Sequence, residues 1–289
     1  MGMDLYYALG GGLGHLTRAR AALATLHAQA RVLTVSPHAA DPMLTRGLDL
    51  LQVPDRAAED PRGFRPWLHG LLWRERPARL YLDCFPAGLF GELCGLPLPP
   101  GLELHHLARL LRWDAYARLL QGEAPRMHRI HMLEPLAADH VRWLAAHGLV
   151  PETLQLRDPG LTTPAMACER LAALAVPRWL IVHSGPQGEI RELVAYARDM
   201  AAMEGEHPRL VLVAPLAMAA AADGCLHIPA YPARGLFPLA QRIITACGFN
   251  TMRETESFRA IHRFLPMPRR FDDQHTRAAQ RAWGTSRLP

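Results

Sequence analysis

The feature of this chain that most constrains its fold is a pattern that occurs twice: an apolar run, a glycine-rich loop and a helix-forming segment. In the first copy, residues 5–9 (LYYAL) precede GGGLGH at residues 10–15, and residues 16–27 are rich in Ala, Leu and Arg. In the second copy, residues 179–183 (WLIVH) precede SGPQG at residues 184–188. A strand that enters a helix through a glycine loop is typical of α/β folds with parallel sheets.

The rest of the chain continues this alternation of strands and helices. Residues 150–164 (VPETLQLRDPGLTTP) are rich in Pro and Thr and are expected to link two halves. We therefore predict two Rossmann-like domains, residues 1–158 and 159–289, whose parallel sheets face an interdomain cleft. Further strands are expected at residues 31–35, 80–83, 129–133, 210–214, 227–229, 242–245 and 263–265. Helices are expected at residues 65–76, 104–120, 136–147, 189–203 and 236–241, from residue 251 and from about residue 272.

Charge and cysteine usage restrict the class of partner and the compartment. The net charge is +5, and every one of the 32 Lys+Arg residues is Arg, so chemistry that needs a lysine is excluded. The positive charge favours an anionic partner, such as a phosphate-bearing ligand or an anionic membrane surface. The arginines are dispersed and no basic module with interleaved aromatic residues occurs, so nucleic acid is not expected. The five cysteines lack a C-x-x-C pattern, which indicates reduced thiols in a cytoplasmic protein.

One stretch leaves open a peripheral contact with the inner face of a membrane. Residues 65–80 (RPWLHGLLWRERPARL) carry Trp67 and Trp73 among Leu and Arg, as an interfacial helix does. A helix that buries its Leu face and leaves its Arg side in water explains the same pattern equally well.

The first glycine loop predicts an anion site and an acid/base residue. Gly12 and Gly14 would let backbone N–H groups approach a ligand at a helix N-terminus, although a plain tight turn has the same sequence. A dinucleotide is disfavoured, because His15 stands where the third glycine of G-x-G-x-x-G belongs. His15 is the candidate base, kept neutral by the helix N-terminus; the alternative is a structural hydrogen bond to the loop.

A second candidate for acid/base chemistry follows a predicted strand. Asp83 is expected at the carboxyl end of that strand, as an acid/base or acceptor contact or as a cap of the loop that Pro86 and Gly88 form. Glu92 is expected to begin the next helix. No D-x-D motif and no His cluster with ligand spacing occurs, so no metal is expected.

Four motifs in order resemble the GT-B glycosyltransferases of the MurG type: GGGLGH, SGPQGEIREL, TACGFNTMRE and DDQHTRAAQ. The segment YLDCFPAGLFGEL also resembles the D-x-x-P-x-G-x-x-x-E-L segment of predicted bacterial glycosyltransferases related to MurG. The resemblance implies that the N-terminal domain binds an unknown acceptor and supplies His15, and that the C-terminal domain binds a nucleotide-diphosphate sugar, with a UDP-sugar the expected donor. No further cofactor is implied.

The resemblance also assigns donor contacts by position. It implies diphosphate or base contacts for Ser184, Gly185, Gln187 and Gly188, and a helix that points at the diphosphate for Gly248, Asn250 and Thr251. Glu254 would accept hydrogen bonds from ribose hydroxyls, or be a solvated helix residue. Asp273 and Gln274 would contact the sugar hydroxyls, or cap the last helix.

The only asparagine of the chain, Asn250, lies just behind Gly248 and is predicted to be the N-cap of a helix that starts near Thr251. A neutral cap would avoid the repulsion that an Asp would exert on a diphosphate. The sequence leaves two alternatives to a glycosyltransferase open. The first is a nucleotide-sugar hydrolase or epimerase of the same fold, and the second is a relative that only binds a nucleotide-sugar or a partner.

Overall fold

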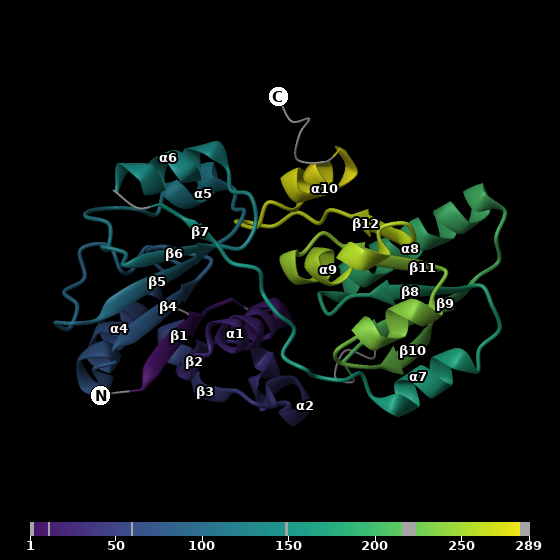
Figure 1. Ribbon diagram of the computed structural model, residues 1–289, viewed down its shortest axis with the longest axis horizontal. Coiled ribbons are helices and arrows are strands. Elements are labelled where there is room, and N and C mark those ends of the chain that lie inside the picture. Colours follow the sequence, from purple (N-terminus) through teal and green to yellow (C-terminus); the bar gives the residue numbers. More distant parts are fainter. Residues whose placement is uncertain (1–2, 11, 59, 148–149, 216–223, 284–289) are drawn as a thin grey trace. The chain divides into compact units, whose positions relative to one another are not determined.

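The computed structural model describes residues 3–10, 12–58, 60–147, 150–215 and 224–283. The chain divides into two compact units (Figure 1). The first unit comprises residues 1–159 together with residues 270–272, and the second comprises residues 160–269 and 273–289. The first unit therefore takes a short segment from near the end of the chain.

The first unit is built on a seven-stranded sheet whose paired strands are all parallel. Its strand order is β3-β2-β1-β4-β5-β6-β7. The order reverses between β1 and β4, and ligands of open α/β sheets bind outside the carboxyl ends of strands at such a switch point. The strands are β1 (Asp4–Ala8), β2 (Ala30–Thr34), β3 (Asp49–Gln52), β4 (Arg79–Asp83), β5 (Glu103–Ala108), β6 (Arg129–Met132) and β7 (Glu152–Thr153).

Helices connect these strands and bury the apolar side chains of the sheet. Leu5, Leu33, Leu80 and Leu104 from four of the strands belong to one hydrophobic cluster with Leu68 of the helix at residues 61–75. The helices are α1 (Leu13–Leu26), α2 (Pro42–Thr45), α3 (Asp55–Ala58), α4 (Pro61–Glu75), α5 (Trp113–Ala117) and α6 (Ala138–Ala146), with a short 3-10 helix η1 (Pro37–Ala40).

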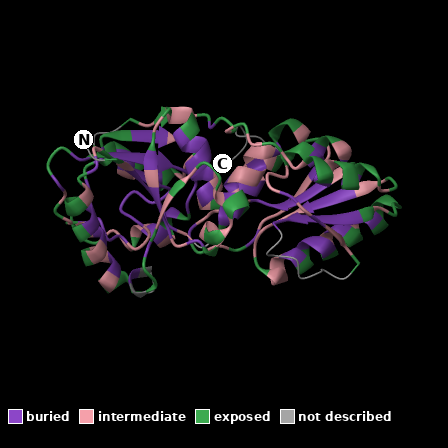
Figure 2. Ribbon diagram, turned by 90° about the horizontal axis from the view of Figure 1, so that it is seen from below, coloured by how far each residue is buried: buried purple, intermediate pink, exposed green. Residues whose placement is uncertain are grey.

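The second unit repeats this plan with five parallel strands in the order β10-β9-β8-β11-β12. Its switch point lies between β8 and β11. The strands are β8 (Arg178–Val182), β9 (Arg209–Ala214), β10 (Leu226–Pro229), β11 (Arg242–Ala246) and β12 (His262–Leu265). The helices are α7 (Ala165–Ala172), α8 (Gln187–Glu204), α9 (Phe249–Glu254) and α10 (Gln274–Trp283), with 3-10 helices η3 (Arg234–Leu239) and η4 (Glu256–Phe258). The strands of both sheets are largely buried, except for the edge strands β3 and β7 of the first sheet (Figure 2).

The structure confirms the predicted α/β class and two parallel sheets, and it corrects several elements. Residues 104–120 are not one helix: they contain β5, a connecting segment and α5. β5 is a central strand buried on both sides, but its sequence ELHHLA includes two histidines and lacks alternation, and Leu104, Leu107 and Leu111 recur at a helical spacing. Glu92 begins no helix, because residues 84–96 form turns and loops. The short strands β3 and β7 and the helix α7 were not predicted from the sequence.

The position predicted for Asn250 is also wrong. α9 begins at Phe249, its N-cap is Gly248, and no side chain caps it. Asn250 is therefore the second residue inside the helix. The backbone of Gly248 is extended, with φ −66° and ψ 146°, a conformation open to any residue, and the helix starts directly after it.

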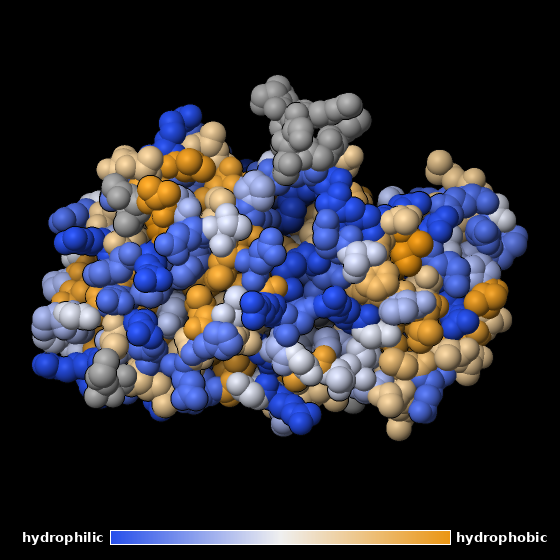
Figure 3. Space-filling view, viewed as in Figure 1, coloured by the Kyte–Doolittle hydropathy of each residue, from blue (hydrophilic) through white to orange (hydrophobic). Residues whose placement is uncertain are grey.

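Helix α4, which covers most of the stretch that resembled an interfacial helix, packs against the sheet. It buries Phe64, Leu68, Leu71 and Leu72, and Trp67 packs on the same cluster. On the face drawn in Figure 3, hydrophobic side chains are interspersed with hydrophilic ones. Within the described ranges, no helix combines the length and the apolar character that crossing a membrane requires.

Candidate functional site

His15 lies in the first turn of α1, directly after the loop that leaves β1. Its side chain is 14% exposed. A Cβ atom on Gly10, whose φ is +155°, would overlap Nε2 of the His15 imidazole. The glycine at the start of this loop is therefore needed for the close approach of the protein's own histidine, a use of glycine that the sequence alone did not reveal.

Asp83, the last residue of β4, is the partner of His15. Its Oδ2 is 2.7 Å from His15 Nδ1, and the carboxylate is fully buried. β1 and β4 are neighbours in the sheet, so the residues that follow them meet at the switch point. The structure thus brings together the two residues that the sequence suggested for acid/base chemistry.

Arg18, one turn after His15 in α1, binds the same carboxylate with two hydrogen bonds. Its Nε donates to Oδ1 at 2.5 Å, and its Nη2 donates to Oδ2 at 2.6 Å. The hydroxyl of Tyr6 approaches Oδ1 at 3.4 Å. Burial alone would raise the pKa of Asp83, but Arg18 and His15 outweigh it and hold the pKa well below its usual value. Asp83 is therefore ionised, and its side chain is fully buried against His15 and Arg18; its role as an acid/base or acceptor contact stays a prediction.

The proton on His15 can be placed from these contacts. Because Asp83 is ionised, its Oδ2 can only accept a hydrogen bond, so Nδ1 of His15 carries the proton and Nε2 has the lone pair. Burial lowers the pKa of His15, and the neighbouring Asp83 only partly opposes this effect. The neutral imidazole that the sequence suggested is thus favoured, with burial rather than the helix N-terminus as the leading cause.

The loop after β4 is fixed by buried polar side chains. Glu92 accepts hydrogen bonds from the hydroxyl of Tyr7 and from the backbone N–H of Phe90. A Cβ atom on Gly88 would overlap the Glu92 carboxylate, and Gly88 has a φ of +85°. The Tyr116 hydroxyl accepts from Ala87 and donates to the Gly88 carbonyl. The glycine and the glutamate of the D-x-x-P-x-G-x-x-x-E-L segment therefore shape the loop that follows Asp83.

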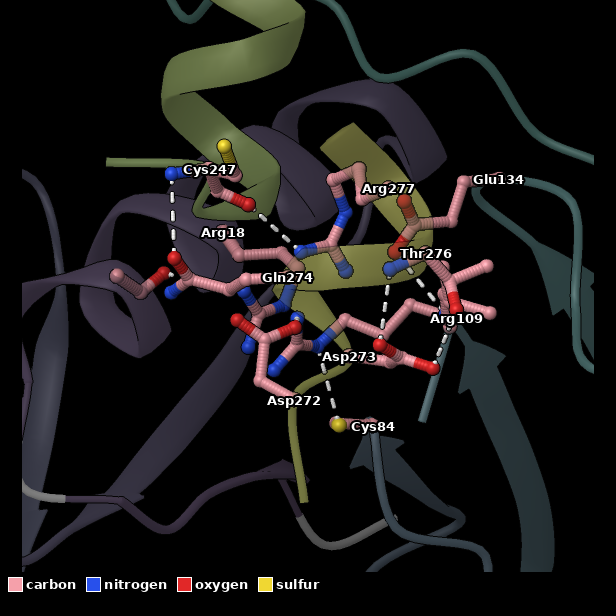
Figure 4. A network of polar contacts seen from close by, with 12 residues as sticks. Arg18, Cys84, Arg109, Glu134, Cys247, Asp272, Asp273, Gln274, Thr276 and Arg277 are labelled. Carbon is pink, nitrogen blue, oxygen red and sulfur yellow. Dashed lines mark hydrogen bonds and ion pairs between the residues drawn. The ribbon is translucent and has the colours of Figure 1, made fainter. Parts of the chain in front are cut away.

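A second ion pair lies beside the first. The buried Arg109 donates from Nη1 to Asp272 at 2.7 Å and from Nε to the sulfur of Cys84 at 3.1 Å (Figure 4). Cys84 follows Asp83 directly and has a φ of 76°, which is rare for a residue with a side chain. Burial raises the pKa of the Cys84 thiol to about 11, so the residue is a thiol and not a thiolate at neutral pH.

The second glycine loop, between β8 and α8, holds a similar triad. His183 Nε2 lies 2.8 Å from Oε2 of Glu189, and Arg269 binds both oxygens of that carboxylate at 2.6 and 2.5 Å. A Cβ atom on Gly185 would overlap His183 Nε2. Burial favours a higher pKa for Glu189, but His183 and Arg269 lower it to about 2. α8 begins at Gln187, so Gln187 and Gly188 lie in its first turn and Ser184 and Gly185 lie in the loop.

The two predicted donor motifs lie side by side in the second unit, because β8 pairs with β11. Gly248, Asn250 and Thr251 follow β11, and Glu254 ends α9. Glu254 is 19% exposed, and burial raises its pKa despite the nearby Arg253. It is therefore largely covered, which excludes the alternative of a solvated helix residue.

The last helix is tied to this motif by internal hydrogen bonds (Figure 4). The Gln274 amide oxygen accepts from the N–H groups of Cys247 and Met267, and Arg277 donates to the Cys247 carbonyl. Asp273 accepts at Oδ1 from the backbone N–H of Thr276 and at Oδ2 from its hydroxyl, so Asp273 caps α10. For Gln274, which is 3% exposed, the structure gives an internal role in place of the predicted cap. Sugar contacts for these two residues stay a prediction.

Sequence reasoning missed most of the charged partners in both loops. Arg18 is three residues after His15 on one helix face, a spacing that was a usable signal. Asp272 and Arg269 come from a segment far along the chain from Arg109 and Glu189, and nothing in one sequence pairs them. Among the residues that the structure describes, no group of three His, Cys, Asp or Glu side chains is placed to hold a metal ion.

Comparisons with known proteins place the fold. No protein-family model matches the chain, and no curated protein matches it in sequence. Solved structures do. The spinosyn rhamnosyltransferase SpnG, complexed with thymidine diphosphate, superposes with a TM-score of 0.57 at 15% identity, over 92% of this chain and 81% of that chain. S. aureus MnaA with UDP superposes with a TM-score of 0.56 at 12% identity, over 93% of this chain and 80% of that chain. The glycosyltransferase SnogD from Streptomyces nogalater superposes with a TM-score of 0.54 at 17% identity, over 96% of this chain and 85% of that chain. The chain has the GT-B fold.

Proposed function

We propose that this protein is a glycosyltransferase that takes a sugar from a nucleotide-diphosphate sugar. The observation that carries the proposal is the pairing of His15 with Asp83 outside the carboxyl ends of β1 and β4, on a fold shared with several solved glycosyltransferases. A buried carboxylate that orients a neutral histidine is an arrangement suited to removing a proton from a hydroxyl group.

In the proposed reaction, Nε2 of His15 accepts the proton of an acceptor hydroxyl. The oxygen attacks the anomeric carbon of the donor sugar, the bond from that carbon to the diphosphate breaks, and the electron pair leaves with the diphosphate. Asp83 keeps the imidazole in the Nδ1–H form, so that Nε2 is the atom that accepts the proton. General-base catalysis of this kind contributes roughly 10²–10⁴-fold to a rate.

The second unit is the proposed donor side, and a UDP-sugar is the proposed donor. Support comes from the two loops at its switch point, between β8 and β11, which is where α/β sheets bind nucleotides. The diphosphate would lie against backbone N–H groups of residues 184–188 and 248–251, with neighbouring arginines neutralising the charge that develops on it. Glu254 would accept from the ribose hydroxyls. The MurG-like type within GT-B is part of this proposal.

The test is turnover of UDP-, GDP- and dTDP-sugars by wild type and by His15→Asn, with and without a panel of hydroxyl acceptors. The Asn amide can still donate to Asp83 but cannot act as a base. We expect transfer to an acceptor, a 10²–10⁴-fold lower turnover in His15→Asn, and unchanged donor binding. His207→Ala, at an exposed histidine of the second unit, is the matched control.

Other outcomes of the same assay identify the alternatives. If free sugar is released whether or not an acceptor is present, the protein is a nucleotide-sugar hydrolase. If the sugar changes while it stays attached to the nucleotide, the protein is an epimerase. Binding without turnover would leave a binding protein. The proposal fails altogether if no nucleotide-sugar binds.

The donor side has a separate test at Asn250. Asn250→Asp adds a negative charge in the first turn of α9, where the diphosphate is proposed to lie. Repulsion should weaken the binding of nucleoside diphosphates by about 5–10-fold, on the order of 1 kcal/mol, while the thermal midpoint without ligand stays near that of wild type. A thermal-shift titration with UDP measures both quantities. Equal affinity in wild type and variant would place the diphosphate elsewhere.

A further inference from the structure

The carboxylate that binds His15 is already balanced by a buried positive charge. Oδ2 of Asp83 accepts from His15 Nδ1 at 2.7 Å and from Arg18 Nη2 at 2.6 Å, and Oδ1 accepts from Arg18 Nε at 2.5 Å. Arg18 is 3% exposed and Asp83 is fully buried, so neither charge is compensated by water. The 3.1 Å separation of Arg18 Nη2 and His15 Nδ1 follows because both are donors that converge on one oxygen.

We propose that Arg18 is a positioning residue that neutralises Asp83 and thereby keeps His15 uncharged, with its Nε2 lone pair available, at neutral pH. In a simple histidine–carboxylate pair, an unbalanced negative charge favours the protonated imidazole. Here the negative charge is shared, so Asp83 fixes the orientation and tautomer of His15 without strongly favouring its positive form. A carboxylate normally orients a histidine and also favours its protonated form. With Arg18 bound to it, Asp83 keeps the first effect and largely loses the second.

The other charged and titratable groups around His15 act in the same direction or are themselves paired. Arg109 is the second guanidinium that disfavours a positive imidazole, and its own partner is Asp272. Tyr6 and Cys84 are buried, and burial raises the pKa of each, so both are uncharged. The site therefore contains two arginine–aspartate pairs and a neutral histidine. Protonation of His15 would add a third positive charge to a buried group of residues.

The inference rests on the proposed function only for its effect on catalysis; the charge state of His15 is measurable without any substrate. A pH titration of the histidine side-chain nitrogens by ¹H–¹⁵N NMR on the full-length protein reports which ring nitrogen carries the proton and at what pH the ring becomes charged. The His15 signals are assigned by their loss in His15→Asn.

Arg18→Met is the decisive variant, and Arg18→Lys retains the charge. With the balancing charge removed, the pKa of His15 should rise by about 1–3 units in Arg18→Met, and it should stay within about half a unit of wild type in Arg18→Lys. Arg31→Met breaks a partly exposed pair with Asp49 in the same unit and should leave the titration of His15 unchanged. An unchanged pKa of His15 in folded Arg18→Met overturns the proposal.

A second variant covers the risk that Arg18→Met does not fold because it leaves a buried charge unpaired. Arg18→Met/Asp83→Asn removes both charges, so His15 should titrate close to its wild-type pKa. Asp83→Asn alone leaves Arg18 unbalanced and should lower the pKa of His15. Equal pKa values for His15 in wild type, Asp83→Asn and the double variant would also overturn the proposal.

The kinetic prediction distinguishes failure of this inference from failure of the proposed function. If the protein transfers sugar, the acid limb of kcat/KM should move to higher pH in Arg18→Met by the shift that NMR measures. A shifted titration in a protein without transferase activity would support the role of Arg18 and reject the enzyme. Transfer with an unshifted acid limb and an unshifted titration would reject the role of Arg18.

Discussion

At the scale of single residues, a glycine of the first loop has a role other than the phosphate contact that the motif predicts. The glycines of GGGLGH suggested backbone that approaches a phosphate. In the structure, the missing side chain of Gly10 leaves room for the imidazole of His15. The loop therefore orients the candidate base from one side, and Asp83 orients it from the other.

Gly10→Ala should consequently act through His15. The added methyl group would occupy the position of Nε2, so the imidazole must rotate away from Asp83. We expect at least a 10²-fold loss of the proposed transfer activity, since a displacement of about 1 Å in a reacting group has an effect of this order. Turnover and the NMR signals of His15 are the measurements. Gly70→Ala places a methyl group in open space on α4 and is the control. If Gly10→Ala turns over substrate at the wild-type rate, His15 takes no part in the reaction.

The sequence was sufficient to identify His15 and Asp83 as site residues but not to predict the contacts that they make. His15 could be identified because it follows a glycine loop, and Asp83 because it ends a predicted strand. The role of Asp83 was not predictable, because it depends on Arg18 and on complete burial, which are properties of the folded protein. The pair of His183 with Glu189 was not predicted, although His183 ends the run WLIVH and Glu189 lies six residues later in SGPQGEIREL.

At the scale of elements, the strands that open the two sheets followed from the sequence because a glycine loop ends each apolar run. The first strand of each sheet was found within one residue at each end. β5 was not found, because ELHHLA has neither alternation nor a glycine loop after it, and Leu104, Leu107 and Leu111 recur at a helical spacing. Helix starts were less predictable than their existence. α8 and α9 each begin two residues earlier than expected, since neither uses a side chain as its cap.

α10 does have a side-chain cap, and this gives a test that needs no ligand. Asp273→Ala removes the acceptor for the N–H and hydroxyl of Thr276, so the free energy of unfolding should fall by about 1 kcal/mol. Asp273→Ser restores an acceptor at the cap and should recover most of this loss. Urea denaturation measures both variants. If the two variants are equally stable, the cap contributes nothing. A lower affinity for a nucleotide-sugar in Asp273→Ser would add the predicted sugar contact to the capping role.

At the scale of the whole molecule, buried neutral histidines should make the protein sensitive to mild acid. Burial lowers the pKa of His106 to about 4 and the pKa values of His140 and His262 to about 3. His140 is stacked on Trp113 at 4.0 Å, and neither of its ring nitrogens has a hydrogen-bond partner. An unfolded histidine binds a proton near pH 6.5, so the unfolded chain gains protons first as the pH falls.

The contribution of these histidines to stability is therefore complete above about pH 6.5 and is lost as the pH falls from there to about 4 for His106 and to about 3 for His140 and His262. Below pH 6.5 each one should reduce the free energy of unfolding by up to about 1.4 kcal/mol per pH unit. Urea denaturation at pH 7, 6 and 5 measures the slope. His140→Phe preserves a stacked ring without a titrating group and should make the slope shallower, whereas His207→Gln at an exposed site should not. A free energy of unfolding that is constant from pH 7 to 5 would contradict the prediction.

The first unit is also incomplete without residues 270–272. Phe271 packs between Phe85 and Tyr116, with ring centroids 5.6 and 5.8 Å away, and its carbonyl accepts from Arg112 at 2.7 Å. Asp272 balances the buried Arg109. A fragment of residues 1–159 should therefore be destabilised by roughly 3–5 kcal/mol through the unpaired Arg109 alone. Thermal unfolding of that fragment, with and without a fragment of residues 160–289, tests this. A fragment 1–159 as stable by itself as with its complement would refute it.

The same three residues set a rule for how genes of this kind can recombine. A crossover at the linker between the two units exchanges more than the second unit, because it also replaces residues 271 and 272, which belong to the unit that is kept. In a chimera that joins residues 1–159 to a foreign C-terminal half, foreign residues take the place of residues 270–272 in the core of the first unit. Domain exchange therefore succeeds only when the incoming half carries an aromatic residue and an acid at these positions, or when the short insert is transplanted with its parent.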